Sequence, residues 1–432
     1  MEILQWATVF MAMCIVHGSM VVQEKSKLKE KFSWKNVEYD WPTPSAKEEA
    51  IRTQKYIPES NLPLGLDVWK DKLFITVPRF AAGVASTLNY VRITDNNPDN
   101  SPVLKPYPNW QFHNVDVDSN GFIVNNMSLA SVFRVRVDEC DRLWVMDSGF
   151  IDHLGIQVKL PTIYIFDLNT DQLIRQHQIQ LSDMKPGSYF INVVVDVPKN
   201  QCDNAHAYVP DLISGVVVYS YKLDQSWRAE HNFFHFDPSY TDYNVGGVNF
   251  QFVNGIFSLA LGNPDNMGVR TVYFHALSSS REFAVPNVVL QNQTRATSTE
   301  SFHDYYLVGD RGSNGQSTAS FLDEKSNVLF YAQVNKDAVY CWNANKPYNW
   351  NTQGLVDMNS DSLVFVNDLK VDRDGYLWVL SDRLPVFIYS KLNPNQFNYR
   401  ILRGKVSELI AGTACEINKY CTTDGLILYP NN

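Results

Sequence analysis

An apolar residue followed by an aromatic residue recurs six times along this chain, each time inside a run of residues typical of a β-strand. Successive aromatic residues of these pairs are 70, 64, 65, 57 and 48 residues apart. A motif that returns at intervals of tens of residues indicates an architecture built from repeated units. The pairs are Leu73-Phe74, Leu143-Trp144, Ala207-Tyr208, Val272-Tyr273, Leu329-Phe330 and Leu377-Trp378.

The clearest unit runs from Val364 to Leu392 and predicts three short strands separated by turns. Asp372 and Gly375 supply the first turn, because an aspartate can bond its own backbone and a glycine takes positive φ without steric cost. The apolar runs Leu377 to Leu380 and Val386 to Tyr389 predict the second and third strands.

Two copies of this unit agree closely: VDECDRLWVMDS, which begins at Val137, and VDRDGYLWVLSD, which begins at Val371. Six units predict an all-β fold, a six-bladed β-propeller whose blades are four-stranded sheets and whose radial closure leaves only short edges. The alternative is a β-rich chain in which such pairs arise by chance. Because a propeller holds a long chain in one unit, residues 20–432 are expected to form a single domain.

The N-terminal part of the predicted domain carries a strand and the one clear helix. Phe32 to Asp40 reads as a strand. Ser45 and Glu48 form a capping box, which predicts a short helix from Ala46 to Tyr56. At the other end of the chain, the polar tail contains a last strand-like stretch, Leu426 to Tyr429.

Charge and hydropathy narrow the classes of partner. The formal net charge of -9 and the lack of a basic cluster argue against nucleic acid, whose phosphates require concentrated Lys and Arg. Small molecules or proteins are the expected partners. The apolar run Ile3 to Val16 predicts a signal peptide over residues 1–19, too short for a membrane span, so the mature protein is expected to be secreted and extracellular.

Five cysteines follow the predicted signal peptide, so at most two disulfides and one spare thiol can form within one chain. We predict that Cys140 pairs with Cys202 and that Cys341 pairs with Cys415, because each bond would join neighbouring or closing blades. Cys421 is then left over. No C-x-x-C spacing occurs, so no metal site is predicted from the cysteines.

Two sequons, at Asn126 and Asn292, lie in polar, loop-like surroundings and predict N-glycosylation if the chain is secreted. His231 and His235 have a spacing that suits a metal on a helix, but their aromatic, turn-flanked context favours a strand or a loop. There is no G-x-S-x-G elbow and no P-loop, so acyl and phosphoryl transfer have no motif support.

Polar residues at the start of the last unit are the strongest candidates for a ligand site in the central channel. They are Asn367, Asp368 and Asp372 along one strand and turn, and Asp382 with Arg383 after the next strand. Three carboxylates, an amide and a guanidinium near one channel mouth could hold a cationic amine or a hydrated metal ion. The alternative is that these residues cap turns at strand ends.

Several stretches resemble the insect yellow and major royal jelly protein family over nearly the whole mature chain. The full LSDRLPVFIYSKL segment is more similar to the yellow branch than to the storage proteins. The stretches are FSWKNVEYDWPTPSAKEEAI, ITVPRFAAGVASTLNYV, DECDRLWVMDSG, GIFSLAL, YCWN, LWVLSDRLPVFIYS and AGTAC.

This resemblance implies a secreted six-bladed propeller associated with cuticle pigmentation and melanin formation. Some members convert dopachrome, and salivary relatives bind biogenic amines in the channel through a Thr, an Asn and a Phe. These align with Asn367, Asp382 and Leu384, and none of the three matches. Arg79 in VPRF and Asp147 in VMDSG do match the family pattern, which makes them candidate channel residues.

Several functions remain open at this point. The preferred hypothesis is a protein of the pigmentation pathway that binds an aromatic catechol- or indole-derived molecule, such as an amine, dopachrome or an indole, and uses no cofactor. The first alternative is a dopachrome-converting isomerase. A metal-dependent, lactonase-like hydrolase is disfavoured because the stretch from Leu66 to Arg79 has no axial glutamate. A nutritive secretion is the last alternative, and the sequence leaves the oligomeric state open.

Overall fold

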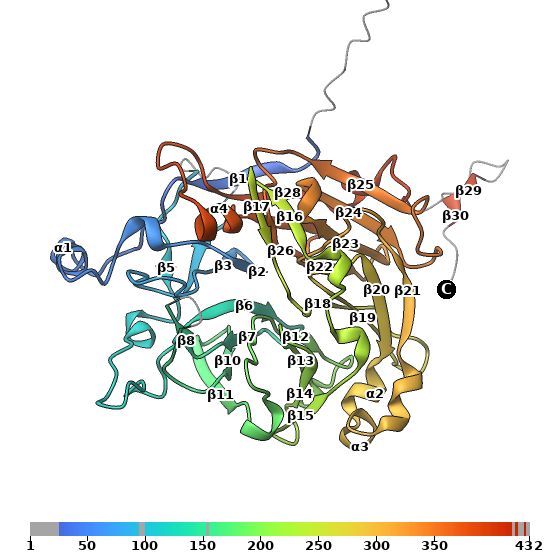
Figure 1. Cartoon of the computed structure of the whole chain (residues 1–432), viewed down its shortest axis with the longest axis horizontal. Coiled ribbons are helices and arrows are strands. Elements are labelled where there is room, and N and C mark those ends of the chain that lie inside the picture. Colours follow the sequence, from blue (N-terminus) through green and yellow to red (C-terminus); the bar gives the residue numbers. More distant parts are fainter. Residues whose placement is uncertain (1–25, 95–99, 153–154, 417–419, 422–426, 429–432) are drawn as a thin grey trace, which may run out of the picture.

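Six four-stranded antiparallel sheets surround one axis in the part of the chain that the structure describes (Figure 1). This computed structural model describes residues 26–94, 100–152 and 155–416, with the backbone of 420–421 and 427–428. The arrangement is the predicted six-bladed β-propeller. The predicted signal peptide, residues 1–19, lies outside the described residues.

The first three blades follow one another in sequence. Blade one contains β2 (Gly65–Trp69), β3 (Lys72–Thr76), β4 (Leu88–Arg92) and β5 (Lys105–Pro106). Blade two contains β6 (Val132–Val137), β7 (Arg142–Asp147), β10 (Thr162–Asp167) and β11 (Gln172–Gln178). Blade three contains β12 (Val194–Asp196), β13 (His206–Pro210), β14 (Val216–Ser220) and β15 (Gln225–Ala229).

The other three blades complete the ring. Blade four contains β18 (Ile256–Leu261), β19 (Thr271–Ala276), β20 (Arg281–Pro286) and β21 (Tyr306–Asp310). Blade five contains β22 (Ser320–Asp323), β23 (Val328–Gln333), β24 (Ala338–Asn343) and β25 (Gln353–Met358). Blade six contains β26 (Val366–Val371), β27 (Tyr376–Ser381), β28 (Tyr399–Lys405) and β1 (Lys29–Trp34).

All six apolar-aromatic pairs lie on the second strand of a blade. These strands are β3, β7, β13, β19, β23 and β27, and each has a paired strand on both sides. Neighbouring blades cover both faces of such a strand, which explains why its apolar run is continuous instead of alternating. The repeat therefore predicted the number of blades, and its pairs mark the second strand of each blade.

The N-terminal strand β1 closes the ring, because it pairs with β28 in the last blade. Trp34 lies opposite Tyr399 in this pairing, and both side chains are buried. The strand predicted from Phe32 to Asp40 exists, but it begins at Lys29 and ends at Trp34. Closure of a blade by the two ends of the chain removes the exposed edges that an open ring would leave.

Helix α1 (Pro44–Arg52) begins two residues before the predicted start. The side chain of Thr43, not Ser45, accepts the hydrogen bond from the Ala46 amide, and Pro44 occupies the first helical position, where no amide donor is needed. The helix ends at Arg52 instead of continuing to Tyr56. The remaining helices are α2 (Asn287–Gln291), α3 (Gln293–Ala296), α4 (Leu384–Tyr389) and α5 (Val406–Ile410).

The third strand predicted in the last unit, Val386 to Tyr389, is wrong, because these residues belong to α4. Arg383 takes a left-handed conformation with φ +54° and turns the chain before the helix. Pro385 then sits in the first helical turn, where its fixed φ suits a helix start. A short apolar run has no periodicity that separates a strand from one helical turn.

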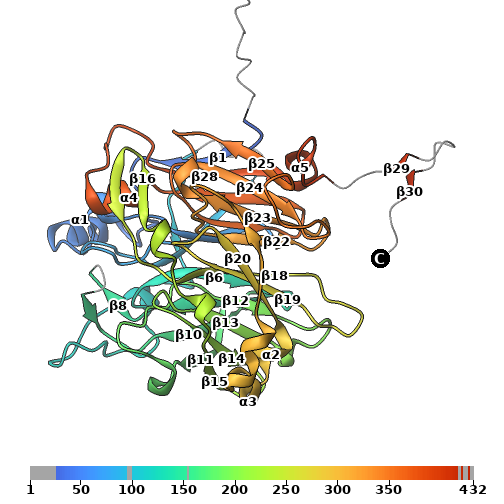
Figure 2. The same cartoon turned by 45° about the vertical axis from the view of Figure 1, so that its right-hand side comes forward.

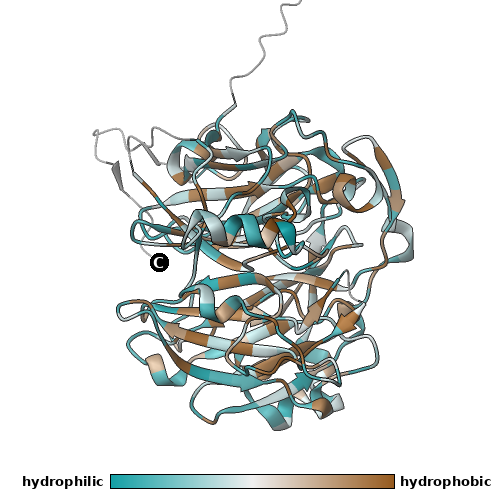
Figure 3. Ribbon diagram, turned by 90° about the vertical axis from the view of Figure 1, so that its left-hand side faces the viewer, coloured by the Kyte–Doolittle hydropathy of each residue, from teal (hydrophilic) through white to brown (hydrophobic). Residues whose placement is uncertain are grey.

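In the described part of the chain, three two-stranded hairpins lie outside the six sheets of the propeller. The hairpin β16 (Asp242–Val245) and β17 (Val248–Gln251) lies beside α4 on one face of the propeller (Figures 1 and 2). The other two are β8 (Phe150–Ile151) with β9 (Ile156–Gln157), and β29 (Tyr420–Cys421) with β30 (Ile427–Leu428). Hydrophobic residues concentrate along the strands, while the loops are mostly hydrophilic (Figure 3).

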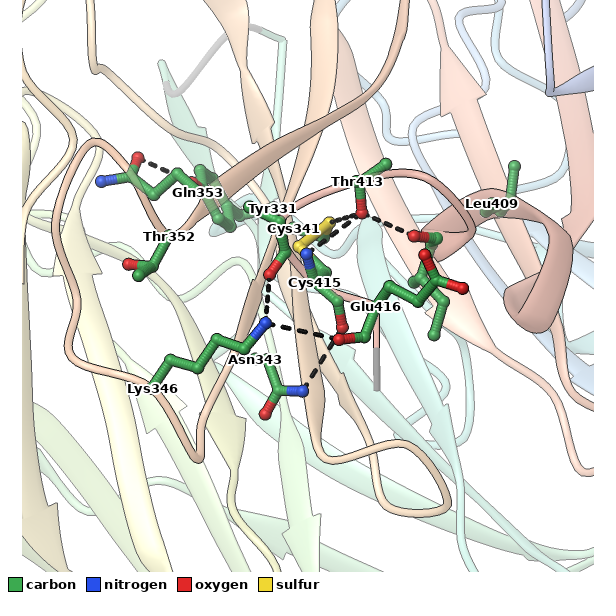
Figure 4. The surroundings of a disulfide bond; sticks show 12 residues. Tyr331, Cys341, Asn343, Lys346, Thr352, Gln353, Leu409, Thr413, Cys415 and Glu416 are labelled. Atoms are coloured by element: carbon green, nitrogen blue, oxygen red, sulfur yellow. Dashed lines mark hydrogen bonds between the residues drawn. A yellow bond between two sulfur atoms is a disulfide. The ribbon is translucent and has the colours of Figure 1, made fainter. Parts of the chain in front are cut away.

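Both predicted disulfides are confirmed. Cys140 and Cys202 join loops of blades two and three, and Cys341 on β24 joins Cys415 in the segment that follows α5 (Figure 4). The sequon residues Asn126 and Asn292 are exposed, so their glycosylation stays a prediction that the surface permits. Over the described residues, no helix has the length and apolar character needed to cross a membrane.

Candidate functional site

Two arginines of one inner strand point toward the axis of the propeller. Arg134 and Arg136 are two positions apart on β6, and successive side chains of a strand point to opposite faces. Both arginines therefore lie on the same face of that strand. Arg134 is fully buried, and its guanidinium lies 4.6 Å from the centre of the Phe257 ring of blade four. Its Nη2 donates to Asn367 of blade six, 2.7 Å from the carbonyl oxygen and 2.5 Å from Oδ1. Arg134 therefore spans the axis.

One end of the axis, which we call the Asp382 end, brings the predicted site residues Asn367 and Asp382 beside Arg134, and a third, Asp368, lies between Arg134 and Lys370. Asn367 Nδ2 donates to Asp382 Oδ2 at 2.7 Å, and the Leu384 amide donates to Asp382 Oδ1 at 3.0 Å. Asp368 Oδ1 lies 4.0 Å from Arg134 Nε. Because Asp382 is completely buried, loss of hydration raises the pKa of its carboxyl well above the ordinary value.

The hairpin β16–β17 packs on α4, which directly follows Asp382. The rings of Phe250 and Tyr389 stack with centroids 5.1 Å apart. At the hairpin tip, a Cβ added to Gly246 would lie 2.8 Å from Val386 Cγ2. Asn367, Asp382 and Leu384 are all buried, so the Asp382 end is closed in this structure.

The opposite end, which we call the Lys370 end, opens into a cavity of about 230 Å³. Arg136 and Lys370 reach it from β6 and β26, and the Arg136 guanidinium lies 4.9 Å from the centre of the Phe321 ring. Residues of five inner strands line it, chiefly Arg136, Val194, Ser258, Leu259, Phe321 and Lys370. The Lys370 end thus combines an apolar wall with the cations Arg136 and Lys370 of the inner strands, and Arg270, Lys325 and Arg373 line the same cavity.

Two other predicted site residues are not part of the Asp382 end, and one of them, Asp372, lines the cavity at the Lys370 end. Arg383 turns toward Asp361, with Nη2 2.8 Å from Asp361 Oδ1, and does not accompany Asp382. Asp372 accepts hydrogen bonds from the Tyr376 amide and the Trp378 indole, so it caps the turn after β26, as the alternative interpretation expected.

Arg79 and Asp147, the two residues that match the family pattern, hold loops of blades one and two. Arg79 donates to the carbonyl oxygens of Val84, Leu129, Ala130 and His113. Asp147 accepts from the backbone amides of Ala130, Ser131 and Gly149. A guanidinium and a carboxylate engaged with backbone groups have a structural role here, and a channel role for them stays untested.

His231 packs in an aromatic cluster, because its ring stacks on Tyr305 with centroids 4.2 Å apart. Its Nδ1 also accepts a hydrogen bond from the Phe233 amide. In the part of the chain that the structure describes, no group of three or more His, Cys, Asp or Glu side chains is arranged to hold a metal ion.

Sequence reasoning missed Arg134, Arg136 and Lys370. A signal was present in VFRVRV, since two arginines at a spacing of two must share one face of an otherwise apolar strand. Cations on the inner face of a buried strand require partners or a ligand.

Comparisons with known proteins give a consistent result. A family model described as "Major royal jelly protein" matches residues 130–415. A protein named "Protein yellow" from Drosophila yakuba is 37% identical over 397 residues, which cover 90% of this chain and 71% of that protein. The same name in Drosophila pseudoobscura pseudoobscura has 36% identity over 415 residues, 94% of this chain and 72% of that protein. The Drosophila melanogaster protein of this name is 37% identical, with 90% and 71% covered.

Proposed function

This chain belongs to the yellow and major royal jelly protein family, and we propose that it is a secreted pigmentation protein that binds a catechol- or indole-derived aromatic molecule on the propeller axis. The name shared by its relatives supports the link to pigmentation. Its two disulfides support secretion, because such bonds persist in oxidising compartments.

The observation that carries the proposal is the cavity at the Lys370 end. Small-molecule sites are concave and mostly apolar, with a few polar groups that fix the orientation of the ligand. Phe321, Leu259 and Val194 offer apolar surface to a ring, and Arg136 and Lys370 offer charged donors to its oxygen substituents. A volume of about 230 Å³ is suited to a ligand of one or two rings.

The Asp382 end is less suited to be the entry for a ligand. Asn367 already donates a hydrogen bond to Asp382, and the Arg134 side chain occupies the axis beside them. A ligand there would have to displace buried side chains and the hairpin above them. The proposed site is therefore the other end of the same channel.

A titration of the purified secreted protein with dopamine and with 5,6-dihydroxyindole tests the proposal. Phe321→Ala removes the ring that faces the cavity and is expected to weaken binding about tenfold, since an aromatic contact contributes about 1 kcal/mol beyond its buried area. Phe302→Ala is the matched control, because Phe302 is 48% exposed and lies outside the cavity. Equal affinities of wild type and Phe321→Ala, or no binding of either compound, would contradict the proposal.

Dopachrome conversion is the second candidate function, and the paired cations favour it. A quinone oxygen that gains negative charge is stabilised by preorganised donors in a site shielded from water. The test follows loss of the visible colour of freshly made dopachrome with native protein, heat-treated protein and Lys370→Met. Loss of colour that requires native protein and disappears in Lys370→Met would favour an enzyme. The same rate of loss with native and with heat-treated protein would favour binding without turnover.

A further inference from the structure

Two cations of the inner strands line the cavity at the Lys370 end, and the carboxylates that pair with these two cations lie behind its wall. Arg136 and Lys370 line the cavity, whereas their carboxylate partners Asp67 and Asp368 do not. Arg136 Nη1 lies 3.2 Å from Asp67 Oδ2, and Lys370 Nζ lies 2.5 Å from Asp368 Oδ1. Both carboxylates are at most 2% exposed. They therefore lie beneath the surface of the cavity, where they fix the positions of the two cations.

The two buried carboxylates have no oxygen left for a ligand. Asp67 accepts the amides of Val68 and Val137 through its two oxygens. Asp368 accepts the amides of Leu66 and Leu369 in the same way. Their negative charge is therefore saturated by backbone donors as well as by the two cations.

Acidic residues that do line the cavity are also engaged or lie at its rim. Asp323 Oδ2 accepts the amide and the hydroxyl of Ser326. Asp372 accepts the amide of Tyr376 and the indole of Trp378. The side chains of Glu139 and Glu324 are 58% and 54% exposed. A cationic ligand would thus find few free acceptors in the cavity.

Donors remain free on both cations. Among the described residues, Arg136 donates one hydrogen bond, from Nη1 to Asp67, and its Nη2 lies 3.9 Å from Glu139. The Lys370 ammonium, which has three protons, reaches Asp368 and the carbonyl of Leu369, the latter at 3.4 Å. A carboxylate has the acceptor geometry that a guanidinium and an ammonium together can satisfy.

We infer that the cavity selects aromatic carboxylates over aromatic amines, with Arg136 and Lys370 holding the carboxylate and Phe321 contacting the ring. This inference rests on the proposed function, because it names the class of ligand for the same site. Charge-assisted hydrogen bonds to such a pair are expected to tighten binding about tenfold to hundredfold relative to the same ring without the carboxylate.

Three probes with one ring system test the inference: indole-2-carboxylate, indole and tryptamine, titrated by calorimetry in a buffer without phosphate. Indole-2-carboxylate is expected to bind at least about tenfold more tightly than indole, and tryptamine more weakly than indole, because its ammonium meets two cations. Equal or tighter binding of tryptamine would overturn the inference.

Two substitutions assign the selectivity to residues. Lys370→Met keeps the length of the side chain and removes the ammonium, so the advantage of indole-2-carboxylate over indole should fall about tenfold while indole itself is unaffected. Lys222→Met is the matched control, because Lys222 is exposed and is not among the residues that line the cavity. An unchanged advantage in Lys370→Met would also overturn the inference.

Lys370→Met leaves Asp368 with one charged neighbour fewer, so its folding is checked by circular dichroism. Arg136→Gln serves as the second variant, because the glutamine amide can still donate to Asp67 while the positive charge is lost. The same loss of selectivity is expected there. The two proposals fail differently: no binding of any probe contradicts the proposed function, whereas equal binding of indole and indole-2-carboxylate contradicts only the inference.

Discussion

Arg134 of blade two donates to both the backbone and the side-chain oxygen of Asn367 of blade six, across the axis of the propeller. The same guanidinium reaches the carbonyl of Ile191, in the segment that leads into blade three, and lies over the Phe257 ring of blade four. One side chain of blade two thus contacts blades four and six and the segment before blade three at the centre. This link also separates the closed Asp382 end from the cavity at the Lys370 end.

Replacing Arg134 by methionine is expected to destabilise the protein by about 3 to 5 kcal/mol, since it leaves several buried oxygen atoms without a donor. The free energy of unfolding in urea, measured for wild type and Arg134→Met, checks this. Arg281→Met is the control, because Arg281 is exposed on β20, the third strand of blade four, and its loss should have no measurable effect. A similar small effect of both substitutions would show that Arg134 is not a central link.

The architecture could be predicted because its signal is local. Pairs such as Leu143-Trp144 mark strands covered on both faces, and a continuous apolar run is visible in a single sequence. The disulfides could be predicted because bonds between neighbouring blades left few pairings. The run Val386 to Tyr389 could not be assigned, because Pro385 and the left-handed Arg383 decide its conformation.

The site could be predicted only in part, because it forms between distant strands. Asn367 and Asp382 were found as polar residues at adjacent strand ends, and they do meet. Their partner Arg134 comes from a blade more than 200 residues earlier. The inner face of β6 becomes the axis only when the ring closes, so the sequence shows that Arg134 and Arg136 share one face of a strand but not which residues that face meets.

Removing the disulfide between Cys341 and Cys415 should lower the stability of the protein without unfolding it. The bond closes a loop with a sequence separation of 74, and loss of such a bond costs about 2 to 4 kcal/mol. The carbonyls of Ala414 and Cys415 also accept from Lys346 and Asn343, which should keep the segment docked (Figure 4). Urea unfolding of the variant with both cysteines changed to alanine checks this, and an unfolded variant would contradict it.

The two ends of the axis should respond independently to mutation. Asp382→Asn changes the closed end, where the asparagine oxygen can still accept the Leu384 amide. The affinity of an aromatic ligand for the cavity at the Lys370 end is therefore expected to stay within about twofold, since separated sites are nearly additive. Calorimetry on Asp382→Asn and Lys370→Met measures this. A large loss of affinity in Asp382→Asn would place the ligand at the Asp382 end instead.

Asp337 should make stability depend on pH. Its Oδ1 is buried without a hydrogen-bond partner among the described residues, and burial raises the pKa of its carboxyl from 3.8 to about 6. Because the folded protein holds this proton more tightly than the unfolded chain, this carboxyl favours the folded state below about pH 4. That contribution is lost as the pH rises toward 6.

Asp337→Asn removes the titration and keeps a residue type that tolerates the left-handed backbone at φ +47°. The variant is expected to be more stable than wild type at pH 7, with a difference that shrinks from pH 6 to pH 4. Urea unfolding at these pH values measures it. Asp203→Asn, at an exposed position, is the control. Parallel stability curves for wild type and Asp337→Asn would refute the prediction.

Two adjacent glycines at the tip of the β16–β17 hairpin provide a matched test of its docking on the propeller. Gly246 and Gly247 both have positive φ, at +60° and +81°. Because L-residues are strained in this conformation, alanine at either position destabilises the turn by about 1 kcal/mol or more. A Cβ on Gly246 would lie 2.8 Å from Val386 Cγ2 and 3.1 Å from Val364 Cγ1. A Cβ on Gly247 would meet no atom of the described residues within 4 Å.

Gly246→Ala is therefore expected to detach the hairpin tip, whereas Gly247→Ala only strains its turn. Hydrogen exchange of residues 242–251 should speed up more in Gly246→Ala than in Gly247→Ala, because local opening frees the amides of both strands. Exchange in the six blades should not change. Equal acceleration in the two variants would mean that the backbone cost alone controls the hairpin, and that contact with Val386 and Val364 does not keep the Asp382 end closed.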